Sequence, residues 1–299
     1  MLHVNLIAFS PDEYHIVSGS SDNTIHLWDA ETGNAIGKPL EGHSSYVSSV
    51  AFSPNESCIT SVSWDSTVLL WDAETSDAIG KPSKGYYNCV SSIAFSPNGS
   101  HIVSGLWDST IHLWDAGTCG AIRKLLKGHH NYVSSIAFSP NGSHIVSGWD
   151  VDTGDTIGKS FKGHSSYVNS VTFSPDVSCI MSGSRDNTIY LWDADTGDAI
   201  GKLFEGHSSY VSSVAFSPDG SHIVSGLSDN TICLWDPEKG DTIRKLLEGH
   251  SSYVSSITFS PNGSHIVSGS WDNTICFWDV ETGDTIGKAL EEHFSGKCD

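Results

Sequence analysis

SSYVSSITFSPNGSHIVSGSWDNTICFWDVETGDTIGKALEEH, residues 251–293, is one unit of a repeat that fills the chain. The period is visible in two sets of Trp-Asp pairs that are spaced 43 residues apart. These pairs begin at Trp28, Trp71 and Trp114, and at Trp192, Trp235 and Trp278. A period of this length indicates a fold built from stacked, similar units, and it overrides any segment-by-segment assignment.

The repeat unit predicts four short β-strands. In residues 251–293, β-rich segments begin at Tyr253, His265, Ile275 and Thr285, and turns rich in Pro, Asn, Gly and Asp separate them. Such a pattern is typical of an antiparallel meander. A single sheet of this kind cannot cover both of its faces, whereas sheets packed radially cover one another and ring closure protects the ends.

The recurring Gly-His, the Ser-Gly-Ser-x-Asp turn and the terminal Trp-Asp resemble the WD40 repeat family over essentially the whole chain. The resemblance implies an all-β fold, a seven-bladed β-propeller of four-stranded antiparallel blades. We expect one propeller domain over residues 1–293, followed by a tail at 294–299. The seven expected blades span residues 1–43, 44–86, 87–129, 130–164, 165–207, 208–250 and 251–293.

Blade 4 is expected to be defective. The Trp-Asp pair at Trp149 follows Trp114 by 35 residues, so eight residues of the 43-residue unit are missing. By comparison with blade 7, the missing residues are the tight turn and most of the third strand. One explanation is a gene-model error or a decaying repeat, and the other is a notch shaped for a partner.

Each intact blade contains a His, a Ser and an Asp, a set that could suggest a catalytic triad. Because the set recurs from blade to blade, we favour a structural role. Resemblance to the family implies that the three side chains and a Trp form a hydrogen-bonded tetrad, in which buried polar groups satisfy one another. The tetrads expected from motif position are His43, Ser61, Asp65 and Trp71; His164, Ser182, Asp186 and Trp192; His207, Ser225, Asp229 and Trp235; and His250, Ser268, Asp272 and Trp278.

Three blades depart from this pattern. Tyr86 replaces the His of blade 3, and blade 4 keeps His129 and Ser147 but loses its turn. Blade 1 has no preceding Gly-His. We expect His293, which follows the last outer strand, to reach Ser18 and complete the tetrad of blade 1 where the two chain ends meet.

The family also implies that the loop after the fourth strand and the turn after the second strand share one face, the top face. One of these positions carries Tyr in most blades, and the other, just before the turn Asp, is Ser in some blades and Trp or Arg in others. Exposed aromatic and Arg side chains often contribute most of the energy of an interface. The alternative is that these rings only pack on neighbouring blades. The predicted protein-binding residues are Tyr46, Trp64, Trp107, Tyr132, Tyr167, Arg185, Tyr210, Tyr253 and Trp271.

Composition argues against several other classes of ligand. The formal net charge is −20, with 15 basic and 35 acidic residues, so we expect no nucleic acid partner. No metal or cofactor is expected, because the regularly spaced His residues fall on different blades. No apolar run is long enough to span a membrane, and the seven cysteines are scattered, which favours the cytosol or nucleus.

The sequence therefore predicts a non-catalytic scaffold or recognition platform that binds a protein or peptide, as a monomeric ring or as part of a longer chain. A propeller hydrolase is the first alternative, but it would need unlike carboxylates converging on the channel. A purely structural spacer in a larger multidomain protein is the second. The near-identical units are also similar to the WD40 arrays that end fungal NACHT-type immune receptors, where the propeller is the proposed sensor.

Overall fold

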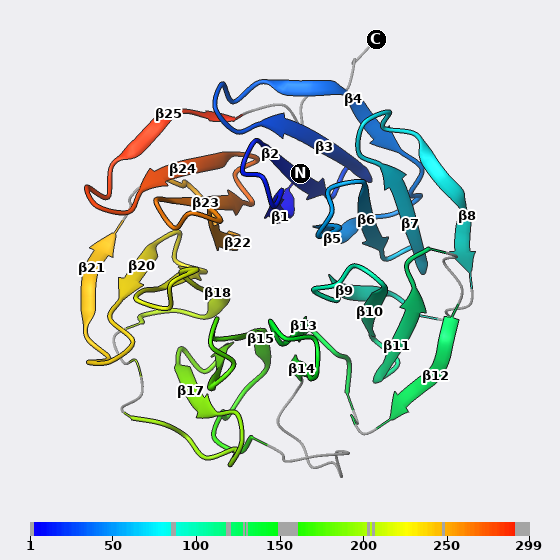
Figure 1. Cartoon of the computed structure of the whole chain (residues 1–299). Helices are drawn as coiled ribbons and strands as arrows, with labels where there is room; N and C mark the ends of the chain where they lie inside the picture. The colour runs from blue at the N-terminus through cyan, green and yellow to red at the C-terminus, as the bar shows by residue number, and fades with distance from the viewer. Residues whose placement is uncertain are drawn as a thin grey trace.

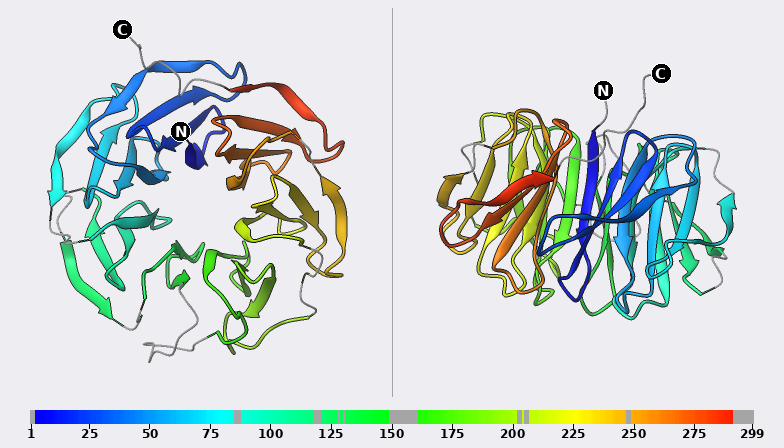
Figure 2. Two further views of the ribbon diagram at one scale, coloured as in Figure 1. Left: turned by 180° about the vertical axis from the view of Figure 1, so that it is seen from behind. Right: turned by 90° about the horizontal axis from the view of Figure 1, so that it is seen from above.

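The computed structural model describes residues 3–84, 88–117, 121–127, 129, 131–148, 161–201, 204, 207–246 and 249–290. Within these residues the fold is all-β, and the sheets are arranged radially around a central axis (Figure 1). Viewed from the side, the ring is a flat disc (Figure 2). Each sheet lies within one of the expected repeat units, and the all-β propeller is confirmed.

Five sheets are four-stranded meanders in which each strand pairs with the next along the chain. Their strands are β1 (Val4–Phe9), β2 (His15–Ser20), β3 (Thr24–Asp29) and β4 (Ala35–Glu41); β5 (Val47–Phe52), β6 (Cys58–Ser63), β7 (Thr67–Asp72) and β8 (Ala78–Lys84); β9 (Val90–Phe95), β10 (His101–Leu106), β11 (Thr110–Asp115) and β12 (Ala121–Lys127); β18 (Val211–Phe216), β19 (Ile223–Leu227), β20 (Ile232–Trp235) and β21 (Thr242–Leu246); and β22 (Val254–Phe259), β23 (His265–Ser270), β24 (Ile275–Asp279) and β25 (Thr285–Leu290).

The other two sheets correct the prediction of seven four-stranded blades. Blade 5 has three strands, β15 (Val168–Phe173), β16 (Cys179–Ser184) and β17 (Ile189–Asp193). The described residues of its outer segment pair with β17 through two isolated bridges, Ile189 with Phe204 and Trp192 with Ala199. The fourth position holds a two-stranded sheet, β13 (Ser135–Phe138) and β14 (Ile145–Gly148). The described residues thus form six blades of three or four strands and one two-stranded remnant.

The remnant follows from the eight missing residues. In blade 7, the turn and third strand directly follow Gly269, whereas in blade 4 the corresponding Gly148 ends β14. The two inner strands keep the usual register, with Ile136 opposite Ser147. The remainder of the expected unit up to residue 160, including Trp149, lies outside the described residues.

Hydrogen bonds between innermost strands join each blade to the next. One side chain near the start of each inner strand donates to the carbonyl of a Val in the following blade, and the series closes on itself. The seven bonds are Asn5 to Val47, Ser48 to Val90, Ser91 to Val133, Ser134 to Val168, Asn169 to Val211, Ser212 to Val254 and Ser255 to Val4. We call this set the carbonyl ring.

A second set of contacts fixes how closely the blades approach. Six blades have a Gly in the second strand, and a Cβ added at Gly105 would lie 2.6 Å from Cγ1 of Val133 in the next blade. Overpacking of this kind forces atoms to shift. Blade 2 has the buried Val62 at this position, so this one interface accommodates a larger side chain.

Blade 7 and blade 1 meet through the same contacts as the other neighbours. The Ser255 hydroxyl donates to the Val4 carbonyl at 2.5 Å, and the backbone N–H of Ile7 donates to Ser256 Oγ at 3.3 Å. Val4 and Leu290 belong to one buried apolar cluster. The ring closes by packing and side-chain hydrogen bonds, with four strands from its own repeat in each of these two blades.

Loss of one carbonyl-ring bond should lower stability measurably. Ser212 is buried, and its hydroxyl lies 2.5 Å from the Val254 carbonyl oxygen. We expect Ser212→Ala to lower the free energy of unfolding by about 1–3 kcal/mol, because a buried carbonyl loses its donor. Urea denaturation measures the change. The control, Ser221→Ala, removes an exposed turn hydroxyl and should change stability by less than about 0.5 kcal/mol. Equal losses in the two variants would contradict this role for the ring.

Candidate functional site

The meander places two kinds of loop on opposite faces of the disc. The turn between second and third strands lies at the same end as the connection between blades, while the turn between third and fourth strands lies at the other end. A backbone hydrogen bond joins the two top-face positions within a blade, as from Trp64 N–H to the Tyr46 carbonyl at 3.0 Å. The same bond links Arg185 with Tyr167, and Trp271 with Tyr253.

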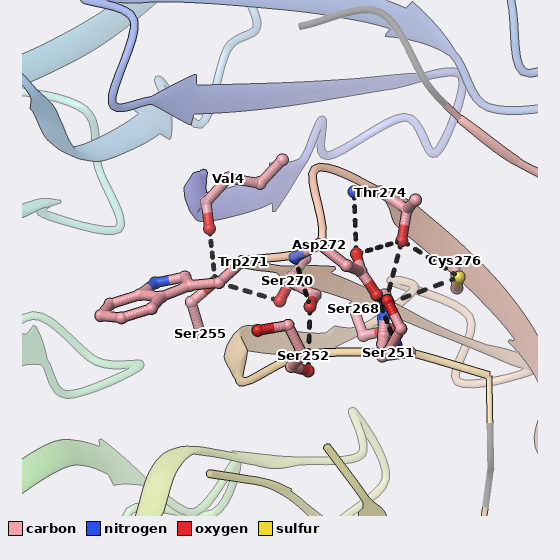
Figure 3. Close-up of polar contacts among 12 residues, drawn as sticks. Val4, Ser251, Ser252, Ser255, Ser268, Ser270, Trp271, Asp272, Thr274 and Cys276 are labelled. Atoms are coloured by element: carbon pink, nitrogen blue, oxygen red, sulfur yellow. Dashed lines mark hydrogen bonds and ion pairs between the residues drawn. The ribbon is translucent and has the colours of Figure 1, made fainter. Parts of the chain in front are cut away.

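The expected tetrads lie beneath this face, and in blades 2, 5 and 7 all four side chains are joined. In blade 2 the indole N–H of Trp71 donates to Ser61 Oγ at 2.8 Å. His43 contacts Ser61 through Nε2 at 2.8 Å and Asp65 through Nδ1 at 3.2 Å. Blade 5 repeats these contacts with His164, Ser182, Asp186 and Trp192. Blade 7 repeats them with His250, Ser268, Asp272 and Trp278; Figure 3 shows part of this cluster.

The geometry of a tetrad does not suit nucleophilic catalysis. Ser61 and Ser268 are completely buried, and each hydroxyl oxygen accepts a hydrogen bond from a Trp indole. A nucleophile has to reach a substrate, and these Ser side chains are sealed inside a sheet. The Ser–His–Asp arrangement therefore acts as an internal brace.

Blade 6 departs from the expected tetrad. Trp235 donates to Ser225 Oγ at 2.9 Å, but His207 lies 3.4 Å from Ser225, and its Nδ1 is buried without a hydrogen-bond partner. Asp229 instead accepts a hydrogen bond from the Ser208 hydroxyl at 2.6 Å. The chain of four is thus broken between His207 and Asp229, which sequence position alone does not reveal.

The incomplete blades keep parts of the tetrad. Trp28 donates to Ser18 at 2.8 Å in blade 1, and Trp114 donates to Ser104 at 3.1 Å in blade 3. In blade 4, His129 Nε2 lies 2.6 Å from Ser147 Oγ. Tyr86 and His293 lie outside the described residues, so the expected contact between His293 and Ser18 stays a prediction.

The contrast between blades 6 and 7 changes the pKa of the two His residues in opposite directions. Burial lowers the pKa of His207 to about 4, against a weaker opposing effect of Asp229. Burial also opposes the charged form of His250, but hydrogen bonds to Asp272 and Cys276 outweigh it and raise the pKa to about 9. The two residues differ because His250 has hydrogen bonds to Asp272 and Cys276, whereas His207 has no hydrogen bond to Asp229.

The three top-face Trp side chains expected from the sequence are exposed, with exposed fractions of 41% for Trp64, 40% for Trp107 and 46% for Trp271. Tyr46, Tyr210 and Arg185 are also exposed, while Tyr132, Tyr167 and Tyr253 are half-buried. Figure 3 shows Trp271 pointing away from the Asp272 and Thr274 cluster of its own blade.

Rings from successive blades form a continuous row on this face. Ring centroids are 5.2 Å apart for Tyr46 and Trp64, 5.1 Å for Trp64 and Trp107, 5.6 Å for Trp107 and Tyr132, and 5.5 Å for Tyr132 and Tyr167. The Arg185 guanidinium ends the row, 5.2 Å from the Tyr167 ring centroid. We call these six residues, from blades 2 to 5, the aromatic arc. The rings pack on neighbouring blades and still expose area, while their role in protein binding stays a prediction.

The remaining predicted residues are separate from the aromatic arc. Tyr253 and Trp271 pair at 4.9 Å in blade 7, and the ring of His3 in blade 1 stacks on Trp271 at 4.8 Å. Tyr210 lies in blade 6 between these groups in chain order. His3 was missed from sequence, although it occupies the Tyr position of its repeat, directly before Val4.

Arg185 is fixed by a residue that also belongs to the carbonyl ring. Its Nε donates to Asn169 Oδ1 at 3.2 Å, while Asn169 Nδ2 donates to the Val211 carbonyl at 2.8 Å. An amide can accept and donate at once through two different atoms. The signal in the sequence was the Asn at 169, where most repeats have Ser.

Metal sites and membrane-spanning helices are two further features to consider in the part of the chain that the structure describes. Within it, no group of three or more His, Cys, Asp or Glu side chains could hold a metal ion. The described residues also include no helix that could cross a bilayer.

The fold and its repeated tetrads define a β-propeller built from tandem repeats. The chain belongs to the WD40 family, because it matches WD domain, G-beta repeat at seven places that cover most of its length. These are residues 2–29, 34–72, 80–115, 120–157, 154–193, 199–236 and 240–279. No curated protein matches the chain significantly. WD40 propellers are typically non-catalytic scaffolds for protein interactions.

The pH dependence of stability should reveal the open tetrad of blade 6. His207 is buried and its folded-state pKa is about 4, below the ordinary value of 6.5, so the unfolded chain takes up a proton first as pH falls. Stability should therefore decline between pH 6.5 and 4, by about 3 kcal/mol from this residue at most. We expect His207→Gln to flatten this decline in urea denaturation at several pH values.

His250→Gln is the matched variant with the opposite sign. The folded-state pKa of His250 is raised to about 9, so its protonation stabilises the fold fully below pH 6.5 and is lost as pH rises through 9. The loss of stability in His250→Gln should thus be larger at pH 6 than at pH 9. An unchanged acid decline in His207→Gln would show that His207 is not neutral in the fold.

Proposed function

We propose that the protein is a non-catalytic recognition platform that binds a protein or peptide through the top face of its propeller. The observation that carries this proposal is the exposure of Trp64, Trp107 and Trp271 at a position that the fold can fill with Ser. Ser21 and Ser228 occupy it in blades 1 and 6. Large exposed aromatic side chains that the fold does not require are typical anchors of interfaces.

The rigidity of the arc supports the same proposal. Each ring of the arc contacts a neighbouring ring, so less rotamer entropy remains to be lost on binding. In blades 2, 3 and 5 a backbone hydrogen bond also fixes the position just before the turn Asp. The opposite face carries the acidic loops between third and fourth strands, including Asp72, Asp193 and Asp279.

We infer the wider setting from sequence alone. The scattered cysteines, of which Cys58, Cys89, Cys179, Cys233 and Cys276 are free, support a cytosolic or nuclear location. The close similarity of the repeats supports a sensor role of the kind proposed for the WD40 arrays of fungal NACHT-type receptors. In this proposal, the top face is the surface that binds the partner.

Replacement of the three Trp side chains by Ser should separate binding from folding. We expect the triple variant of Trp64→Ser, Trp107→Ser and Trp271→Ser to fold, because Ser occupies this position in two blades. Peptides selected from a displayed random library against the wild-type protein should bind the variant more than about tenfold more weakly, given at least 1 kcal/mol per anchoring aromatic. Isothermal titration calorimetry measures the affinities.

The control is a triple variant on the opposite face, Asp72→Asn, Asp193→Asn and Asp279→Asn, which should retain the selected peptides. Thermal unfolding followed by circular dichroism checks that both variants fold. Selected peptides that bind the Trp variant as tightly as the wild type would place the binding surface elsewhere.

A further inference from the structure

Two aromatic side chains on the top face already contact nitrogen-bearing planar groups of the protein itself. The Arg185 guanidinium lies over Tyr167, 5.2 Å from the ring centroid. The His3 imidazole stacks on Trp271, with centroids 4.8 Å apart and planes inclined by 22°. Arg185 and Tyr167 therefore already form a contact between a cation and an aromatic ring on this face, which the ring quadrupole stabilises.

Trp64 and Trp107 are exposed and adjacent, and their ring contacts are with aromatic side chains. Their centroids are 5.1 Å apart, with Tyr46 and Tyr132 on either side. In the part of the chain that the structure describes, neither ring is in contact with an Arg, Lys or His side chain. Trp is the aromatic side chain that binds cations best, and both residues are about 40% exposed.

The charge around these rings favours a cation. The net charge of −20 attracts basic partners over long distances. Asp65 follows Trp64 directly, and hydrogen bonds from His43, Thr67 and the Ser44 backbone outweigh the effect of burial and hold the pKa of its carboxyl below the usual range. In the chain, Trp64 is thus followed directly by an ionised carboxylate. Arg185 is the one Arg or Lys at the two top-face positions of the repeats.

We propose that Trp64 and Trp107 bind the side-chain cations of a basic, extended peptide segment of a partner protein. The inference rests on the proposed function and adds the chemistry of the ligand. In an extended chain, side chains at positions i and i+2 point the same way and are about 7 Å apart. The two ring centroids are closer, at 5.1 Å, but Arg and Lys side chains are long and flexible enough to converge from that spacing, so one can lie over each ring.

Binding of synthetic peptides tests the proposal. The probe is a ten-residue peptide of alternating Arg and Ser, and the control peptide has Glu in place of Arg. Fluorescence anisotropy measures both affinities at about 150 mM salt, where weak surface attraction is screened. The wild-type protein should prefer the Arg peptide. Trp64→Ser and Trp107→Ser should each weaken its binding about threefold or more, as expected for an exposed cation on an aromatic ring.

Two matched variants separate this contact from general attraction by the acidic surface. Tyr14→Ser removes a more exposed aromatic side chain from the turn between β1 and β2, at the opposite face of the ring, so it should weaken the Arg peptide less than twofold. Arg185→Ser should strengthen binding of the Arg peptide, because it removes a like charge and uncovers Tyr167. Trp64→Phe keeps an apolar ring with a weaker quadrupole and should give an intermediate loss, which preserves the test if Trp64→Ser fails to fold.

The outcomes distinguish this inference from the proposed function. Four outcomes would each overturn the cation site. The wild-type protein could prefer the Glu peptide, or Arg185→Ser could lose binding of the Arg peptide. Tyr14→Ser and Trp64→Ser could lose binding equally, or both Trp64→Ser and Trp107→Ser could leave it unchanged. If library-selected peptides still depend on the three Trp side chains in that case, the top face remains the binding surface for ligands of another chemistry. If they do not, both proposals fail.

Discussion

The structure depends on one repeated contact, the hydrogen bond from the innermost strand of each blade to a Val carbonyl of the next. In the carbonyl ring, seven such bonds return to Val4, the residue with which β1 begins. A typical hydrogen bond of this kind contributes about 1 kcal/mol, and a buried carbonyl without a donor would cost more. The bonds matter chiefly because each blade supplies a donor to a carbonyl of the next, so all the interfaces between blades share one geometry.

The same contact explains how the ring tolerates a damaged unit. All of its donors come from the start of the first strand, and the close approach between blades is set by the second. Blade 4 retains both strands, with Ser134 donating to Val168 and Gly148 lying against the Val168 side chain. Both kinds of contact between blades come from the two inner strands, so the shortened repeat keeps its place in the ring.

Much of the fold could be predicted from the sequence because the repeat supplies many copies of each signal. The period, the turns and the Trp-Asp pairs place the strands, and the missing eight residues locate the defect near Gly148. The two isolated bridges of the described outer residues of blade 5 were not predictable, because motif position does not determine how regularly a segment pairs. Likewise, motif position identifies His207 and Asp229 but not their failure to meet, because Ser208 competes for the carboxylate at 2.6 Å.

For the candidate site, the sequence predicted which residues lie on the top face but not how they contact one another. The differences between otherwise similar repeats identify Trp64, Trp107 and Arg185, because a position that varies among near-copies is free of the constraints of the fold. Sequence could not show that the rings would touch across blades, nor that Asn169 would serve both the carbonyl ring and Arg185. That double role links the two levels of the structure: a residue that fastens blade 5 to blade 6 also sets the direction of the cation that ends the aromatic arc. The scaffold thereby fixes the charge pattern of the surface as well as its shape, which is the condition for a rigid face to select one sign of ligand over the other.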